Sequence, residues 1–526
     1  MIDPHKTEII IAGPGVGKTT ELLNRVEDAL GQGVPPVEIA FFSFSTTAVN
    51  EGLNRITQRL PYRKNQFRYF KTLHAMAFSL LGINTQQVIS YKLLSTFAKD
   101  NDLKISAIDY RTGIKKYQTP DMILLGQLES ARMLGLSVRD YFIKFKIEEP
   151  SIARAEEIDS KYTQFKLAHG VIDFTDMILL ANKSDFDTPH FQYMFIDEAQ
   201  DLSTQQWMFV ERLAENADHV VIVGDERQAI ADFAGADVDY FLNLKGKITT
   251  LNQSYRVPRN IYKLARRVER HMVKTRNADW KPRPLDFQET VAGEIHYIND
   301  IPLREMARGS WLLLTRTNAQ LTEFKDYMMK ACEVLPVYFT VDGEPPLDTD
   351  VFKAIQMFEA MKLNPAITKY DFITIDDDDT DEQKKKKEKF ILLLKKFMSS
   401  KCSWKTELDS VFMHRFSYRN WWDAFDKISI LEKRYIKKLI PCYQRNPNMF
   451  NEAKIKLSTI HSAKGMEADN VILYTALSGK VYHEWQNTKD INDSEVKVLF
   501  VGITRARYKL YLLGNKGQYS YEELLK

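Results

Sequence analysis

Short apolar runs that end in clusters of polar residues recur along the first half of the chain. They are EIIIAG (8–13), IAFFSFS (39–45), QYMFIDEAQD (192–201) and HVVIVGDERQ (219–228). A continuous apolar run of this length predicts a strand buried on both faces, as in parallel sheets. Directly after the first run, apolar residues recur at helical spacing: Leu22, Leu23, Val26, Ala29 and Leu30. The pattern predicts an α/β core with its functional side chains at the carboxyl ends of parallel strands.

A second group of strand signals follows later in the chain. It comprises KITTLNQSYR (247–256), SWLLLTRTNAQ (310–320), KIKLSTIHSAKG (454–465), NVILYTAL (470–477) and KLYLLG (509–514). Two other stretches lack this pattern and are expected to be mostly helical. The chain is therefore expected to form two α/β cores, each with a helical insertion. The predicted ranges are 1–84 and 165–249 for the first core, 85–164 for its insertion, 250–363 and 453–526 for the second core, and 364–452 for its insertion.

Length and composition favour a globular protein of several domains. The chain has 526 residues, 44% of them hydrophobic, which is enough to bury large cores. No apolar run approaches the roughly 18 residues of a membrane-spanning helix, and the N-terminus lacks the regions of a secretory signal. The three cysteines are far apart and form no CxxC pair, so they suggest neither a zinc site nor a disulfide framework. We expect a cytoplasmic protein that has no contact with a membrane.

The formal net charge of +3 is too small to imply nucleic acid by itself, but the charge is unevenly distributed. Residues 256–283 hold ten Lys or Arg and only two acids, a local net charge of +8. This stretch is either a solvated helix face or part of a phosphate-binding surface. The run DDDDTDEQKKKKEK (376–389) is expected to be a solvated loop and helix start rather than a metal site, because it lacks turn glycines.

The first apolar run leads into GPGVGKTT, which matches the phosphate-binding P-loop at a strand-to-helix turn. Backbone N–H groups of the loop would point at the β and γ phosphates, and the following helix adds its positive end. Lys18 would bridge the phosphate oxygens, and Thr19 would ligate Mg²⁺. The expected nucleotide-binding residues of this loop are Gly13, Gly15, Gly17, Lys18, Thr19 and Thr20.

The sequence MFIDEAQD supplies the acidic partner that a hydrolytic P-loop needs. Asp197, at the end of an apolar run, can hold Mg²⁺ through water, and Glu198 can accept a proton from the attacking water. Without the P-loop, the same two acids would read equally well as ordinary charges before a helix. Together the two motifs predict hydrolysis of a nucleotide.

The order of motifs resembles the superfamily 1 helicases of the UvrD/Rep type. The matching blocks are AGPGVGKTT, FSFSTTAVNEGLNRI, KTLHAMA, DEAQD, VGDERQAIADFAGAD, LNQSYRVP, TIHSAKGMEADNVIL and VLFVGITRARYKLYLL, with weaker matches in VIDFTDMILLA and LLLTRTNAQ. The resemblance covers the two α/β cores and not the helical insertions. It implies two RecA-like P-loop NTPase cores with ATP and Mg²⁺ bound in the cleft between them.

The resemblance also implies roles on the nucleotide side. Arg256 and Arg505 stand where the family places arginines that neutralise the γ phosphate during hydrolysis, although each alone would read as a surface arginine. Gln228 corresponds to the residue that senses the γ phosphate. Tyr255 corresponds to one that stacks on adenine, with a half-buried core aromatic as the alternative, and Glu467 to one that contacts the ribose.

On the DNA side, the resemblance implies a groove that grips phosphates and stacks bases without reading sequence. Phe44 and Phe233 are the expected stacking residues. The expected backbone contacts are Thr72, His74, Arg316, Asn318, Thr459 and His461. For each of these, core packing or helix capping is the alternative.

The sequence therefore predicts an ATP-dependent translocase and helicase on single-stranded DNA. The resemblance implies 3′ to 5′ movement, junctions of single- and double-stranded DNA as substrates, and roles in DNA repair and replication. In a bacterium the protein would associate with the nucleoid, and a viral protein would act in the host cytoplasm.

Other functions are open at this point. A motor that strips proteins from single strands with little unwinding would carry the same motifs, and a DNA-bound protein would then be its partner. A nucleotide kinase or GTPase would not need two arginines from a second core. A DNA-binding subunit with a degenerate ATPase would have lost Lys18, Glu198 or Arg505, which are all present. RNA is an alternative to DNA, because backbone and stacking contacts do not exclude a 2′-hydroxyl.

Overall fold

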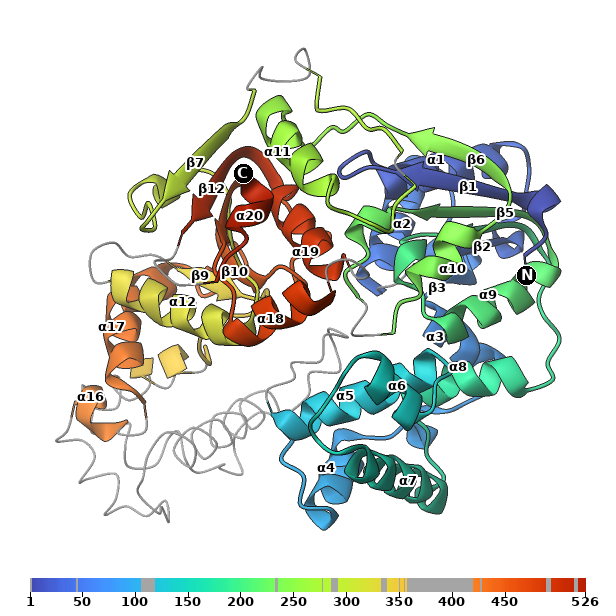
Figure 1. Cartoon of the computed structure of the whole chain (residues 1–526), viewed down its shortest axis with the longest axis horizontal. Coiled ribbons are helices and arrows are strands. Elements are labelled where there is room, and N and C mark those ends of the chain that lie inside the picture. Colours follow the sequence, from blue (N-terminus) through green and yellow to red (C-terminus); the bar gives the residue numbers. More distant parts are fainter. Residues whose placement is uncertain are drawn as a thin grey trace, which may run out of the picture. The chain divides into compact units, whose positions relative to one another are not determined.

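The computed structural model in Figure 1 divides by its contacts into two compact units. The first comprises Met1–His296, Ala476–Leu510 and Lys516–Lys526, and the second comprises Tyr297–Thr475 and Tyr511–Asn515. The structure describes residues 2–43, 46–105, 119–231, 235–276, 278–284, 292–332, 338–349, 351–353, 355–356, 420–425, 428–488, 493–514 and 519–526. Phe44, Phe233, the run 376–389 and most of the predicted insertion 364–452 lie outside these residues.

The first unit is built on a six-stranded sheet with the order β3-β2-β4-β5-β1-β6, in which all neighbouring strands are parallel. Its strands are β1 Thr7–Ala12, β2 Ile39–Phe42, β3 Tyr69–Lys71, β4 Phe191–Ile196, β5 Ala217–Gly224 and β6 Lys247–Leu251. The four apolar runs predicted in this half of the chain form β1, β2, β4 and β5. All four residues of β2 are buried, as expected of a strand that is covered on both faces.

Helices cover both faces of this sheet, and the residues of β1 alternate between the two cores. Ile9 and Ile11 pack into one core and Ile10 into the other, which follows from the two-residue period of a strand. The helices of this unit outside residues 85–164 are α1 Lys18–Gly31, α2 Thr46–Arg59, α3 Leu73–Leu80, α8 Phe174–Lys183, α9 Thr204–Glu215, α10 Val238–Asn243, α11 Arg259–Glu269, α18 Gly479–Thr488, α19 Ser494–Ile503 and α20 Glu522–Leu525.

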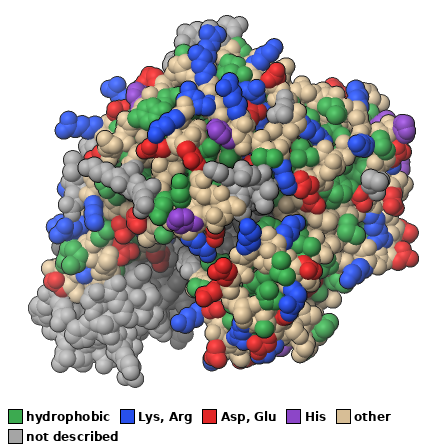
Figure 2. Space-filling model, viewed as in Figure 1, with side chains coloured by type: hydrophobic (Ala, Val, Ile, Leu, Met, Phe, Trp, Pro, Cys, Tyr) green, Lys and Arg blue, Asp and Glu red, His purple; other side chains and the backbone are tan. Residues whose placement is uncertain are grey.

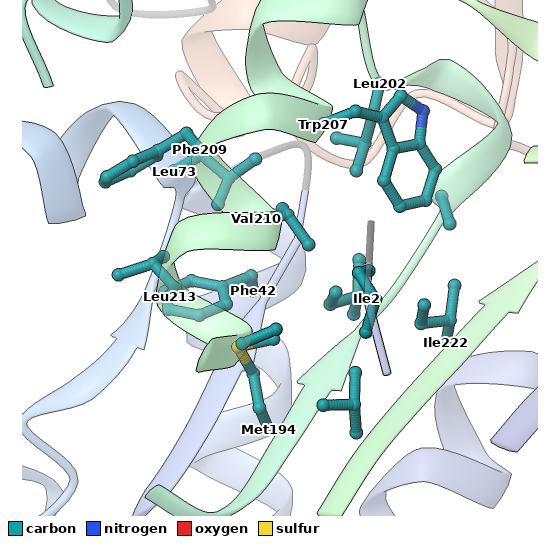
Figure 3. Close-up of a cluster of buried hydrophobic side chains, with 14 of the residues drawn as sticks. Ile2, Phe42, Leu73, Met194, Leu202, Trp207, Phe209, Val210, Leu213 and Ile222 are labelled. Atoms are coloured by element: carbon teal, nitrogen blue, oxygen red, sulfur yellow. The ribbon is translucent and has the colours of Figure 1, made fainter. Parts of the chain in front are cut away.

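Figure 3 shows one of these cores, where α9 lies against the sheet. Phe42, Met194 and Ile222 from three strands meet Trp207 and Leu213 from the helix, and all five side chains are nearly or fully buried. Burying a side chain of this size contributes roughly 1.5–3 kcal/mol. The helix begins at a capping box in which the side chain of Ser203 accepts from the backbone of Gln206 and that of Gln206 accepts in return. This core fixes the strand ends that carry the candidate site.

The prediction that the run KITTL belongs to the second set of strands is wrong. This run forms β6, which pairs with β1 at the edge of the first sheet, with Ile9 opposite Ile248. Residues of β6 are exposed or only partly buried, as is typical of an edge strand. Periodicity predicts a strand but contains no information on which sheet the strand joins.

Residues 85–164 are helical where the structure describes them. The helices are α4 Tyr91–Asp100, α5 Pro120–Met133, α6 Val138–Lys144 and α7 Ile152–His169. Buried ion pairs join α5 and α7 to the start of α8. Lys166 Nζ lies 2.7 Å from Asp173 Oδ2 and 2.5 Å from Asp176 Oδ2, and Arg132 pairs with the same two acids at 3.2 and 3.1 Å.

A second six-stranded sheet has the order β7-β12-β11-β8-β10-β9. Its strands are β7 Glu294–Ile298, β8 Trp311–Thr315, β9 Phe339–Val341, β10 Ile455–Thr459, β11 Ala468–Tyr474 and β12 Ala506–Leu513. Strand β8 is parallel to β10 and β11, and β10 is parallel to β9. The described helices of the second unit are α12 Asn318–Ala331, α16 Trp421–Ala424 and α17 Ile430–Arg445. The predicted class, α/β with two parallel-sheet cores, is confirmed.

None of the described helices combines the length and the apolar character that crossing a bilayer requires. On the face shown in Figure 2, Lys and Arg side chains are intermixed with Asp and Glu over most of the surface. This distribution agrees with the nearly balanced charge of the sequence.

Candidate active site

The candidate site lies at the carboxyl ends of three adjacent strands of the first sheet, β4, β5 and β1. The loop after β1 runs from Gly13 to Gly17, and helix α1 begins at Lys18. Gly15 and Gly17 have φ angles of 69° and 83°, a left-handed conformation that favours glycine. The loop thus has the strand–turn–helix form that directs backbone N–H groups and a helix N-terminus at an anion.

Four predicted residues meet directly across the ends of β1 and β4. Thr19 Oγ1 donates to Asp197 Oδ2 at 2.7 Å, and Lys18 Nζ lies 3.2 Å from Glu198 Oε2. The side chain of Lys18 is 10% exposed and that of Glu198 is 30% exposed, so the pair is partly shielded from water. A hydroxyl, an ammonium and two carboxylates therefore converge where the P-loop would hold the terminal phosphates.

The charges of this group perturb one another. Burial alone would lower the pKa of Lys18, but the carboxylates of Glu198, Asp225 and Asp197 raise it above its ordinary value. Burial and the nearby Glu198 raise the pKa of Asp197 to about 6. Perturbed carboxyl groups beside a lysine are typical of catalytic sites.

The hydroxyl of Thr19 and the carboxylate of Asp197 suit Mg²⁺. This ion prefers oxygen ligands and keeps several waters, so one or two protein ligands and substrate phosphates complete its shell. The hydrogen bond between the two side chains shows that both oxygens can face one point. The residues present fit the predicted metal.

The backbone of Glu198 is left-handed, with φ of 51°, although it is not a glycine. Such a conformation costs of order 1–3 kcal/mol and is found mainly at functional sites. Gln200, which is fully buried, donates from Nε2 to Glu198 Oε2 at 2.6 Å and accepts from the backbone N–H of Asp225 at 3.0 Å. Gln200 therefore ties the carboxylate of Glu198 to the end of β5.

Gln228 and Arg505, which the sequence predicted separately, are in contact. Nη2 of Arg505 donates to Gln228 Oε1 at 2.7 Å, and Gln228 Nε2 donates to Asp225 Oδ2 at 2.5 Å. Both predicted residues are buried, and Arg505 also donates to the carbonyl of Val501. Arg505, which follows α19, is thus linked through Gln228 to Asp225 at the end of β5.

Arg256 and Tyr255 lie beside the phosphate loop. The backbone N–H of Tyr255 donates to the carbonyl of Gly15 at 2.9 Å, and Ser254 Oγ donates to the carbonyl of Pro14 at 2.7 Å. A Cβ atom at Gly15 would lie 2.4 Å from Arg256 Cβ, so only glycine permits this approach. Tyr255 is 50% exposed, which leaves its ring accessible.

Sequence reasoning missed Gln200, Asp225 and Arg227 as residues of the site. All three lie inside the motifs DEAQD and GDERQ. Each is fully buried at the carboxyl end of its strand. A buried polar side chain needs a partner, so polar residues directly after an apolar run were the available signal.

Predicted DNA contacts in the second unit meet at one edge of its sheet. Thr459 at the end of β10 is level with Thr315 at the end of β8, and Arg316 follows directly. The amide of Asn318 lies in the first turn of α12. Burial and the positive charges of Arg316 and Lys464 lower the pKa of His461 to about 3, so this histidine is neutral at physiological pH.

The other predicted residues lie elsewhere. Thr72 caps helix α3 by accepting from the N–H of Ala75 at 3.2 Å, which is the capping alternative. His74 stands edge-on to Phe174, with ring centres 5.8 Å apart. Glu467 is exposed in the second unit, directly before β11. Thr20 is exposed at the start of α1, where Arg55 donates to its hydroxyl at 3.3 Å.

Protein groups engage much of the basic stretch 256–283. Arg266 and Lys274 pair with carboxylates at 3.0 and 2.7 Å, and Arg267 and Arg276 donate to backbone carbonyls. The exposed cations of this stretch on or beside α11 are Arg259, Lys263, Arg267 and Arg270. The surface available to phosphates is therefore smaller than the local charge of +8 suggests.

Two family models match the chain. The UvrD/REP helicase N-terminal domain matches residues 2–249, and the UvrD-like helicase C-terminal domain matches residues 436–517. These ranges contain the phosphate loop, both carboxylates, Gln228 and Arg505.

Several bacterial proteins called ATP-dependent DNA helicase PcrA are similar to the chain. The protein of Leuconostoc citreum is 26% identical over 360 residues, which are 61% of this chain and 46% of that protein. The proteins of Bacillus subtilis and Staphylococcus aureus are 25% and 24% identical over 363 residues, which are 61% of this chain and 47% of each relative. The chain thus spans about half the length of the curated relatives it matches.

Proposed function

Because this chain belongs to the superfamily 1 helicases of the UvrD/Rep type, we propose that it is an ATP-dependent translocase on single-stranded DNA that unwinds duplex DNA. The observation that carries the proposal is the set of contacts at the ends of β1 and β4. Lys18 and Thr19 there lie within 3.2 Å of Glu198 and Asp197. This group can hold a nucleotide phosphate and activate water against it.

The residues around the phosphate loop would share the work of hydrolysis. Lys18 binds the β and γ phosphate oxygens, while Thr19 and Asp197 would hold Mg²⁺, which neutralises charge on these oxygens when bound. Glu198 accepts the proton of the attacking water, and Gln200 orients its carboxylate. Arg256 and Arg505 supply positive charge for the phosphoryl oxygens.

The DNA side of the proposal rests on the second unit and on the family. Arg316, Asn318, Thr459 and His461 lie where strands β8 and β10 end, so they can contact one stretch of DNA backbone. A neutral His461 would act there as a hydrogen-bonding group and not as a cation. We further propose that the protein moves from 3′ to 5′ and acts at DNA junctions in repair or replication. Its site of action would be the cytoplasm.

Duplexes with a single-stranded tail on either the 3′ or the 5′ side test the proposal. With ATP and Mg²⁺, we expect displacement of the paired strand from the 3′-tailed duplex and little from the 5′-tailed one. The Lys18→Ala variant should displace neither, because it lacks the phosphate-binding ammonium. Preference for the 5′ tail would overturn the polarity. Removal of a protein block from single strands without duplex unwinding would replace the helicase with a protein-stripping motor.

A further inference from the structure

Arg227 is a buried arginine next to the predicted nucleotide sensor Gln228. It lies in the 3-10 helix Glu226–Gln228 directly after β5, and its side chain has no exposed surface. Its guanidinium donates to Asp225 Oδ1 at 2.8 Å, to the carbonyls of Ala12 and Ala278 at 2.8 and 2.9 Å, and to Glu269 Oε1 at 3.1 Å. Four of its five N–H groups are thus used, on four different segments of the first unit.

Asp225 links Arg227 to groups that are predicted to take part in hydrolysis. Oδ1 of Asp225 accepts from Arg227, and Oδ2 accepts from the amide of Gln228 at 2.5 Å. The carbonyl oxygen of Gln228 in turn accepts from Arg505 at 2.7 Å. The backbone N–H of Asp225 donates to Gln200, which holds Glu198. A shift of the Asp225 carboxylate would therefore move the amide of the predicted phosphate sensor.

The contacts with Ala12 and Glu269 reach the start of the phosphate loop. Ala12 is the last residue of β1 and directly precedes the loop. Oε2 of Glu269 accepts from Trp280 Nε1 at 3.1 Å. Trp280 packs so closely under Gly13 that a Cβ there would lie 3.0 Å from Trp280 Cβ. Arg227 is thereby connected by two routes to the start of the phosphate loop, at Ala12 and at Gly13.

Burial of this charge needs a reason beyond packing. A buried guanidinium loses its hydration, and its two carboxylate partners offset that loss only while the geometry is maintained. A hydrophobic side chain of similar volume could fill the same space, but it could not donate hydrogen bonds to Asp225 and to three other acceptors at once. The planar guanidinium of arginine donates hydrogen bonds in fixed directions, so it is suited to holding several segments of the chain in a fixed relative orientation.

We propose that Arg227 is a positioning residue for nucleotide hydrolysis, which fixes Gln228 through Asp225 and the start of the phosphate loop through Ala12 and Glu269. The inference rests on the proposed ATPase function. Arg227 itself contacts neither phosphate nor water in this scheme. It holds the side-chain amide of Gln228 and the phosphate loop in fixed positions relative to each other. Both can then contact the γ phosphate at the same time.

The test compares Arg227→Met and Arg227→Lys with wild type and with Arg132→Met. Arg132 is a matched control, because its guanidinium also pairs with the carboxylates of Asp173 and Asp176 but lies among the helices of the insertion. We would measure kcat and KM for ATP hydrolysis with single-stranded DNA, the Kd of a fluorescent ATP analogue, and the thermal unfolding midpoint. Glu269→Gln serves as a second variant, since it keeps the shape of the side chain should Arg227→Met fail to fold.

We expect kcat of Arg227→Met to fall by about 10²-fold, the scale for misplaced catalytic groups, while the analogue Kd changes less than threefold. Arg227→Lys should fold as wild type yet recover little of kcat, because an ammonium cannot serve all four acceptors. Glu269→Gln should lower kcat by several-fold, and Arg132→Met should lower the unfolding midpoint without changing kcat.

Two results would overturn the inference while the wild type is active. One is a kcat for Arg227→Met and Glu269→Gln within twofold of wild type. The other is a wild-type unfolding midpoint together with a wild-type kcat for Arg227→Lys. That result would show that the position needs only a positive charge that stabilises the fold. A wild type without any ATP hydrolysis would instead refute the proposed function, and the positioning role with it.

Discussion

The tightest constraint on a single residue of the site is at Gly15. Its φ of 69° is left-handed, and the Cβ atom of Arg256 lies so close that any side chain at this position would collide with it. Gly33, at φ of 90°, has the same kind of backbone but nothing within 4 Å of an added Cβ. Substitutions at the two glycines therefore separate the free-energy cost of the left-handed backbone from that of the steric clash.

Gly15→Ala should abolish most nucleotide binding, whereas Gly33→Ala should leave it intact. Both changes carry the conformational cost, about 1–2 kcal/mol for an L-residue in this region. Only Gly15→Ala also forces Arg256 and the loop apart. Titration with a fluorescent ATP analogue and thermal unfolding of both variants check this. Equal affinities of the two variants would contradict the close contact.

The pKa of His461 differs between the folded and the unfolded chain. Its pKa of about 3 in the folded protein lies below its usual value near 6.5, owing first to burial and then to Arg316 and Lys464. The unfolded chain therefore binds the extra proton as pH falls through about 6.5, and acid favours unfolding there.

Between pH 7.5 and pH 5, wild type should lose more thermal stability than His461→Gln, which lacks this titrating group. Unfolding midpoints of the two proteins at both pH values measure the difference. Equal losses would show that His461 titrates alike in the folded and unfolded chains.

Sequence reasoning found the site residues that belong to recognisable motifs and missed those that support them. Lys18, Thr19, Asp197 and Glu198 could be predicted, because an apolar strand followed by these types has a clear chemical reading. Three of the four partners of Arg227 lie 42, 51 and 215 residues away along the chain, so no local pattern connects them to it. Such a network becomes visible only when the fold brings the segments together.

At the scale of elements, strand order explains why motifs far apart in sequence form one site. β4, β5 and β1 are neighbours in the sheet and all parallel, so their carboxyl ends open on the same edge. Pattern reasoning predicted these strands, but it missed β3, which has only three residues, and assigned β6 to the wrong sheet. Short and edge strands carry too few buried residues for a clear period.

The junction of α5, α7 and α8 depends on a buried cluster of charges that responds to acid. Burial alone would raise the pKa of Asp173, but Arg132 and Lys166 lower it well below its ordinary range. The folded state then binds fewer protons than the unfolded chain, so this contribution is present above about pH 4 and is lost as pH falls below it.

Asp173→Asn should lower stability at pH 7 by roughly 3 kcal/mol, the scale for removing one partner of a buried ion pair. The asparagine can still cap α8, so the loss reports the charge and not the cap. The deficit against wild type should shrink at pH 3.5, where wild-type Asp173 loses part of its advantage. Unfolding curves at both pH values test this, and a deficit independent of pH would argue against the ion pairs.

At the scale of the whole molecule, the sequence predicted two parallel-sheet cores, and both are present. The contact-based units do not follow the predicted ranges, because residues 476–510 group with the first unit. The predicted division into cores and insertions stays a prediction. Periodicity identifies elements, whereas the grouping of elements depends on contacts between distant segments, which composition and period do not encode.

We expect the group around Lys18 and Glu198 to drive a motor on nucleic acid. Steady-state ATP hydrolysis with and without a single-stranded DNA oligonucleotide, for wild type and Glu198→Gln, tests it most directly. We predict strong stimulation by DNA in wild type and, in the variant, retained nucleotide binding with hydrolysis reduced by about 10²–10⁴-fold, the range for loss of a general base. Hydrolysis that is indifferent to DNA and RNA, or that survives in Glu198→Gln, would show that this group does not drive a nucleic-acid motor.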